Sequence, residues 1–273
     1  MKVIFLIARD SIKYLLHQRL LLALILLSLV MTGIYAALML QMKTHIAANY
    51  DAPANAATNS PDWQKMDPKQ RKQMNEAMEQ SGSVMEGMFY GACSFGGSLV
   101  ALWIFSTAVV SEVRQGVIRL TLSKPVTRNQ YLLGKYLGGV AVMLAYACIS
   151  SLAIIAFTRI SAVEISPVLK YAPWLMLCRQ LMLGSVAMLF SLFVSPPLAA
   201  VLAFFCGNGL CSSLSNPFHY ILLSYASFQM FFNIVQGTLV TGHDVLLLTL
   251  YALDVIVIML LLALWRFRTK EVC

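Results

Sequence analysis

Residues 111–136 read SEVRQGVIRLTLSKPVTRNQYLLGKY and form a polar, patterned stretch in the middle of a very apolar chain. The stretch carries five basic residues and one acidic residue, and an apolar run of membrane-spanning length lies on each side of it. A basic interruption between two such runs is typical of a segment at a membrane surface.

The composition indicates an integral membrane protein. The chain has 273 residues, of which 59% are hydrophobic and 12% are charged, and its mean hydropathy is +0.73. A soluble domain usually carries about 25% charged residues, so this chain has too few polar side chains to cover a globule. The net charge of +8 does not point to nucleic acid, because the basic residues sit in short segments beside apolar runs. The partner that the composition predicts is the lipid bilayer.

The apolar runs predict an all-α protein with six transmembrane helices in a single domain over residues 1–273. A membrane-spanning helix needs about 20 mostly apolar residues. The runs that meet this length lie at residues 20–42, 88–110, 131–158, 171–194, 197–214 and 245–267.

Lysine and arginine in the flanks predict the orientation. The N-terminus, the segment 111–130 and the C-terminus are basic, whereas the 43–86 loop has five basic and six acidic residues. We therefore expect both termini and 111–130 in the cytoplasm and 43–86 outside. Two cytoplasmic termini require an even number of crossings. The apolar segment 216–237 is then expected to be an outer re-entrant helix rather than a seventh span.

Two further elements are predicted outside the spans. Residues 1–19 place charged and apolar side chains on different sides of a helix, which favours an amphipathic helix along the inner membrane surface. The alternative is that this helix only extends the first span. Within 43–86, Asp67 as a helix cap, Pro68 after it and Gly82 as a stop predict a short solvated helix.

The opening stretch itself predicts two helices with a break between them. Residues 112–122 suit a short helix, and Pro125 ends it because proline disfavours helical geometry in the preceding residue. Thr127 and Gln130 have the spacing of a capping box, which predicts the start of a second helix. We expect this element to present a rigid basic edge to the cytosol.

The same stretch resembles the signature of the type-2 ABC transporter permeases. The resemblance rests on Glu112, Gly116, Arg119, Leu122, Ser123, Pro125, Val126, Arg128, Leu133, Gly134, Lys135 and Tyr136. A weaker match covers 188–205, and the general plan of an amphipathic helix followed by six spans fits the whole chain.

The resemblance implies a subunit of an ATP-driven exporter in a prokaryotic cytoplasmic (inner) membrane. Two copies of a separate ATPase subunit, which bind ATP and Mg, would work with this chain and with a second permease subunit in a homodimer or heterodimer. Residues 112–124 would be the coupling helix that docks into a groove on the ATPase. Import instead of export stays open.

Individual coupling residues receive expected roles from this comparison. Glu112 would hold the junction with the second span, the apolar side chains would fill the groove, and arginines would meet acidic residues at its rim. The full set is Glu112, Arg114, Gly116, Val117, Ile118, Arg119, Leu120, Ser123, Pro125 and Arg128.

We find no catalytic, cofactor or metal signature in the sequence. The Gly-Lys at Gly134 is not a P-loop, because Asn129 stands where that motif needs a glycine. ATP hydrolysis is therefore expected in the partner. The six cysteines lack metal-site spacing and are expected as reduced thiols. A copper site near Met74 and Met78 is the less favoured alternative to ordinary methionines.

Two charges within the predicted spans, Arg179 and Asp254, form a possible intramembrane polar pair. A charge in the hydrocarbon core costs about 3 kcal/mol unless it is paired or hydrated. The pair would line a transport path, or it would be purely structural, or Arg179 would reach the outer interface.

Two function classes are left by the sequence. One is the permease of an ATP-driven transporter, whose apolar spans suit lipids, hydrophobic peptides or drugs. The other is a membrane anchor or scaffold subunit that has no transport cycle.

Overall fold

The computed structural model describes residues 2–17, 90–110, 127–161, 171–208 and 242–269, together with scattered helical positions between 23 and 41. All regular structure in these residues is helical. The helices are α1 (Lys2–His17), a helix over residues 90–107, α8 (Arg128–Ser161), α9 (Ala172–Ser191), α10 (Pro196–Asn208) and α12 (Gly242–Thr269).

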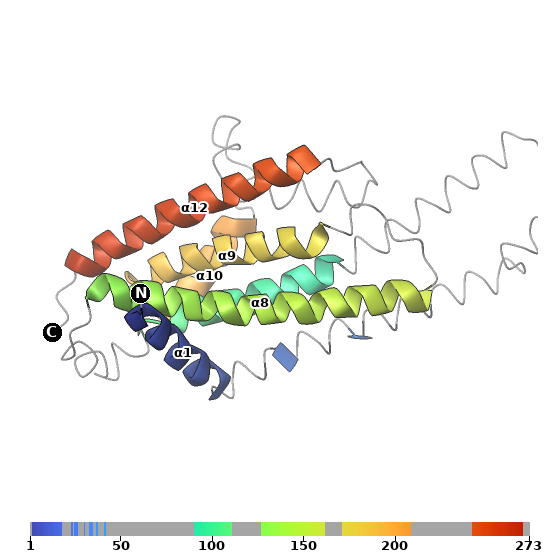
Figure 1. Ribbon diagram of the computed structural model, residues 1–273, viewed down its shortest axis with the longest axis horizontal. Coiled ribbons are helices and arrows are strands. Elements are labelled where there is room, and N and C mark those ends of the chain that lie inside the picture. Colours follow the sequence, from blue (N-terminus) through green and yellow to red (C-terminus); the bar gives the residue numbers. More distant parts are fainter. Residues whose placement is uncertain are drawn as a thin grey trace, which may run out of the picture.

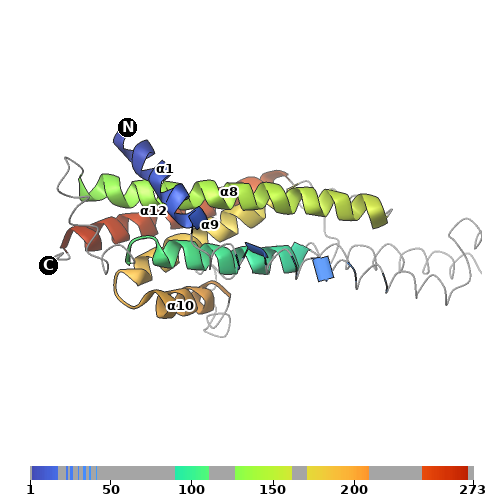
Figure 2. The ribbon, with the colours of Figure 1, turned by 90° about the horizontal axis from the view of Figure 1, so that it is seen from below.

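The long helices lie side by side in a bundle. In Figure 1, α8, α9 and α12 run along the long axis, and α9 packs against α8, α10 and α12. Helix α1 crosses α8 near the end of the bundle where α8 begins and α12 ends. Figure 2 shows α1 and α10 on opposite sides of the bundle, with the helix over 90–107 between α8 and α10. We call the end of the bundle at which α8 begins and α12 ends the α8-start end.

Three of the described helices are long and apolar enough to cross a membrane. Their apolar portions are Arg128–Ala153, Ala172–Ser191 and Val245–Thr269. At a rise of about 1.5 Å per residue, the full length of α8 is about 50 Å, which exceeds the roughly 30 Å hydrocarbon core. Helix α8 therefore extends beyond the membrane on at least one side.

The described helices coincide with five of the six predicted apolar runs. Helices α8, α9 and α12 match the runs at 131–158, 171–194 and 245–267 to within three residues at each end. The helix over 90–107 lies within the run at 88–110, and α10 covers the first part of the run at 197–214. The segments 43–86, 111–126 and 216–237 lie outside the described residues, so the six-span arrangement with a re-entrant helix stays a prediction.

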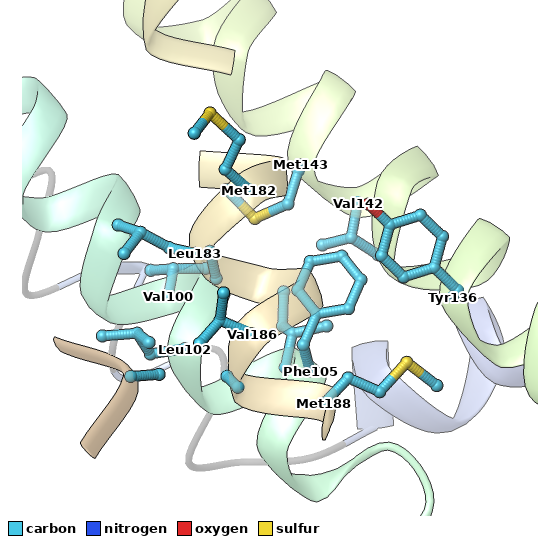
Figure 3. Packing of buried hydrophobic residues seen from close by; sticks show 14 of the residues in the cluster. Val100, Leu102, Phe105, Tyr136, Val142, Met143, Met182, Leu183, Val186 and Met188 are labelled. Atoms are coloured by element: carbon cyan, nitrogen blue, oxygen red, sulfur yellow. The ribbon is translucent and has the colours of Figure 1, made fainter. Parts of the chain in front are cut away.

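The core of the bundle is built around the Phe105 ring. Figure 3 shows this ring among Val142, Met182 and Val186, from α8 and α9. A Cβ added at Gly139 of α8 would lie 2.6 Å from the ring, and one added at Gly184 of α9 would overlap it. The two glycines therefore form a slot that accepts the aromatic side chain, and small residues of this kind let helices approach closely in membranes.

A second pair of glycines seats α1 on α8. A Cβ at Gly134 would lie 2.8 Å from the Ile7 side chain, and a Cβ at Gly138 would lie 2.7 Å from Cβ of Ser11. Ile7 and Ser11 are both buried, whereas Arg9 and Lys13 of α1 are exposed. Helix α1 thus turns one face to α8 through a small-xxx-small pattern and its charged face away from it.

Several hydroxyl groups within the bundle bond to carbonyl oxygens of their own helices. Ser98 donates to the carbonyl of Ser94 at 2.7 Å, Ser150 to that of Tyr146 at 3.0 Å, and Ser185 to that of Met182 at 2.7 Å. Such bonds satisfy a polar side chain without a partner on another helix.

Candidate functional site

The capping box predicted at the start of α8 is present. The backbone N–H of Gln130 donates to Thr127 Oγ1 at 3.3 Å, and the backbone N–H of Thr127 donates to Gln130 Oε1 at 3.2 Å. Two donors that a helix start leaves without intrahelical partners are satisfied in this way. The point at which α8 follows residues 111–126 is therefore sharply defined.

The first turn of α8 is bonded to the last turn of α12. The Arg128 guanidinium donates to the carbonyl oxygen of Arg268 at 3.2 Å and to that of Phe267 at 3.5 Å. In return, Arg268 Nε donates to Asn129 Oδ1 at 3.0 Å. The rings of Tyr131 and Phe267 stack with centroids 6.1 Å apart. We call these five residues the α8–α12 clasp.

Two further basic side chains of the same two helices lie near the clasp. The Lys135 ammonium is buried and lies 5.7 Å from the Tyr131 ring centroid and 5.8 Å from that of Tyr14 on α1. The Arg266 guanidinium lies 5.0 Å from the ring centroid of Phe193, which follows α9. Cation–π contacts of this kind stabilise by about 0.5–2 kcal/mol each. The α8-start end thus gathers basic residues from α8 and α12 against aromatic rings.

Of the predicted coupling residues, the structure describes one. Arg128 belongs to the clasp, where it contacts α12. The other nine, from Glu112 to Pro125, lie outside the described residues, and their roles stay predictions.

A polar layer lies inside the bundle, on the face of α9 that meets the helix over 90–107. Arg179 Nη1 donates to Ser94 Oγ at 2.9 Å, and Tyr146 of α8 donates to the carbonyl of Cys93 at 3.1 Å. Gln180 is fully buried, and its side-chain amide lies against Gly97, which leaves no room for a Cβ there. Among the described residues, neither polar atom of the Gln180 amide has a hydrogen-bond partner.

Asp254 lies on an exposed part of α12, next to the exposed Leu253. Trp174 of α9 donates to Thr249 of α12 at 3.0 Å. Arg179 and Asp254 each lie five residues beyond this bonded pair on helices that run in the same direction (Figure 1), so they have similar depth. The hydrogen bond to Ser94 directs the Arg179 head group to another helix. Direct pairing of Arg179 with Asp254 stays a prediction.

The described cysteines and acidic or histidine side chains show no metal-binding constellation. Within the described ranges, no three His, Cys, Asp or Glu residues form a group that could hold a metal ion. Cys93, Cys148, Cys178 and Cys206 are free thiols. Met74 and Met78 lie outside these ranges.

Comparison with known protein families matches residues 6–272 to the family described as ABC-2 family transporter protein. The chain belongs to the ABC-2 transporter family. The match spans almost the whole chain, from α1 to the end of α12, and so it confirms the resemblance first seen in residues 111–136. No curated protein matches the chain.

Membership of the ABC-2 family makes the chain a multi-pass membrane protein and a permease component of an ABC transporter. A permease of this family works with an ABC ATPase as its partner and is a transport component rather than the catalytic subunit.

Several residues of the clasp and of the polar layer were not predicted from the sequence. Arg268 belongs to the basic C-terminus that predicts the orientation, and Asn129 stands where a P-loop would need a glycine, so neither is predicted to contact the other helix. Gln180 carried a usable signal, because an amide side chain in the middle of an apolar run is unusual. Nothing in the sequence could have paired Arg128 with Arg268, since 140 residues separate them.

Proposed function

We propose that the chain is the membrane-spanning permease subunit of an ATP-driven exporter, in which separate ATPase subunits supply the energy. The observation that carries the proposal is the family match over residues 6–272, which includes the whole 111–136 stretch. A second permease subunit, either another copy of the chain or a related chain, completes the membrane part.

The α8-start end is the side on which we place the ATPase. The helix over 90–107 ends and α8 begins at this end, so the segment between them starts and finishes there (Figure 2). Arg128, Arg266 and Arg268 lie there as well. An excess of arginine and lysine favours the cytoplasmic side, and a basic surface attracts acidic groups on a soluble partner.

The proposed topology has six spans, with both termini and 111–130 in the cytoplasm of a prokaryotic cell and 216–237 as an outer re-entrant segment. It is supported by the direction of the described helices, because α8 begins and α12 ends at the same end of the bundle (Figure 1).

The proposed cargo is a hydrophobic or amphiphilic molecule, such as a lipid, an apolar peptide or a drug. The spans are strongly apolar, and their exposed side chains include Leu246, Leu250, Val257 and Leu261 on α12. In this proposal Arg179 and Asp254 contribute the polar groups near the path of the cargo.

An alanine scan of residues 112–124 tests the coupling role. Truncation of a buried apolar anchor at an interface costs about 2 kcal/mol or more, whereas loss of a charge at the rim costs less. Ile118→Ala is therefore expected to weaken binding of the co-expressed ATPase by roughly thirtyfold, and Arg114→Ala by much less. The measurements are pull-down of the ATPase and the hydrolysis rate of the complex at matched expression.

The scan has a clear opposite outcome. If every variant from 112 to 124 binds and stimulates the ATPase like wild type, this segment is only a connecting loop. Arg159→Ala serves as the control, because Arg159 is an exposed basic residue at the other end of α8.

A further inference from the structure

The α8–α12 clasp joins two helix ends that are far apart in the sequence. Arg128 follows Thr127 in the capping box and therefore lies two residues beyond the segment 111–126. Its guanidinium donates to the carbonyls of Phe267 and Arg268, in the last turn of α12, the last helix that the structure describes.

The hydrogen bonds from Arg128 cap the C-terminal end of α12. The last carbonyl groups of an α-helix have no partner within the helix, and the helix dipole makes them negative. The planar guanidinium of arginine offers several N–H groups in a fixed arrangement, and Arg128 directs one nitrogen to two of these carbonyls. A lysine in the same place would offer a single point of charge.

The reciprocal bond makes the contact specific. Arg128 and Arg268 carry like charges, which by themselves repel each other across the contact. Arg128 is held by backbone oxygens and Arg268 by the Asn129 amide, so each cation has an acceptor on the opposite helix. The buried stack of Tyr131 on Phe267 lies one turn further in and completes the contact.

The position of the clasp suggests a mechanical role. A displacement of 112–124 would reach the start of α8 through Thr127. The next residue, Arg128, is hydrogen-bonded to the last turn of α12. By contrast, the slot of Phe105 and the polar layer of Gln180 link the neighbouring helices at levels deeper in the bundle.

We propose that Arg128 is a positioning residue that transmits movement of the coupling segment directly to α12, so that the start of α8 and the end of α12 move as one unit during the ATPase cycle. This inference rests on the proposed function, in which 112–124 receives the ATPase. It adds a route from the start of α8 to α12, which is far from residues 112–124 in the sequence.

Backbone hydrogen exchange on the intact permease–ATPase complex in lipid nanodiscs tests the inference. Exchange is followed at the first turn of α8 and at the last turn of α12, without nucleotide and after trapping with ATP and vanadate. In the wild-type complex, we expect trapping to change exchange at both places.

The variant is Arg128→Gln, and its matched control is Arg159→Gln, the same substitution at the opposite end of α8. Without nucleotide, Arg128→Gln is expected to speed exchange at the end of α12 by about fivefold or more, the change in open population that corresponds to about 1 kcal/mol. With trapping, exchange at the start of α8 should still respond, whereas the response at the end of α12 should be lost. Arg128→Lys should restore only part of it.

The outcomes separate the two levels of the proposal. If the end of α12 in Arg128→Gln still responds to trapping as in wild type, Arg128 only caps a helix and the transmission inference is wrong, while the proposed function stands. If no ATPase co-purifies with the wild-type chain, or if neither place responds in the wild-type complex, the proposed function fails and the inference fails with it.

Discussion

Single polar residues inside the bundle differ sharply in how well they are satisfied. Arg179 has Ser94, and the Tyr146 hydroxyl has a backbone carbonyl. Gln180, at 0% exposure, has no hydrogen-bond partner for either side-chain atom among the described residues. Such a group costs about 1–3 kcal/mol, and proteins keep this cost mainly where function needs it. The buried amide of Gln180 is therefore expected to lower the stability of the fold.

Replacement of Gln180 by methionine should stabilise the protein. The two side chains have similar length, and methionine removes the amide that is buried without partners, so we expect a gain of about 1–3 kcal/mol. The midpoint of thermal unfolding in detergent measures the change. Gln130→Met is the matched control and should shift the midpoint downward, because Gln130 accepts a capping hydrogen bond. A lower midpoint for Gln180→Met would mean that its amide has partners in the native protein.

At the scale of elements, close approach of helices depends on glycine at two levels. Gly139 and Gly184 admit the Phe105 ring between α8 and α9, and Gly134 and Gly138 admit α1 onto α8. Gly134 of the second pair is one of the residues on which the family resemblance rests, and Gly138 lies one helical turn after it. The structure adds a physical reason for these glycines, because a side chain at either position would meet the surface of α1.

Alanine at Gly134 or Gly138 should therefore loosen α1. The added methyl group would lie under 3.0 Å from Ile7 or Ser11, and overpacking of this kind costs about 1–3 kcal/mol. Hydrogen exchange of the α1 backbone should rise in both variants, while exchange in α12 stays unchanged. Gly33→Ala is the control, since a Cβ at Gly33 meets nothing within 4 Å. Unchanged protection of α1 would show that the crossing adapts to the extra volume.

For the whole molecule, the arrangement of termini follows from the direction of the helices. Helix α8 starts, and α12 ends, at the end of the bundle crossed by α1 (Figure 1). The clasp and the contact of Lys135 with Tyr14 tie α1, α8 and α12 together there. That end presents the basic residues that a cytoplasmic surface would carry.

Cysteine labelling tests the proposed topology. In a background without the six native cysteines, Ser60→Cys should react with an impermeant maleimide from outside the cell, and Ser123→Cys should react only after the membrane is opened. Reaction of both from the same side would contradict the six-span arrangement. A variant with no introduced cysteine controls for residual labelling.

The parts of the fold that were predictable depend on neighbours in the chain. The helix bounds followed the apolar runs, because about 20 apolar residues in lipid must form a helix to satisfy their backbone groups. The Thr127–Gln130 capping box is equally local, since its partners are three positions apart in the chain. The contact of Arg179 with Ser94 was not predictable, since depth can be read from the sequence but the direction of a side chain around an all-apolar helix cannot.

The amino-acid sequence by itself determined that this protein is helical and membrane-embedded, and that it carries the family signature in residues 111–136. These properties arise from composition and from patterns shorter than one helix. Only the tertiary structure decided that Arg128 holds the end of α12, that two glycines enclose Phe105, and that Gln180 is buried without a partner among the described residues. Each of these depends on the packing of helices far apart in the chain, and helices that are apolar on all sides contain no periodic signal that selects the packing face.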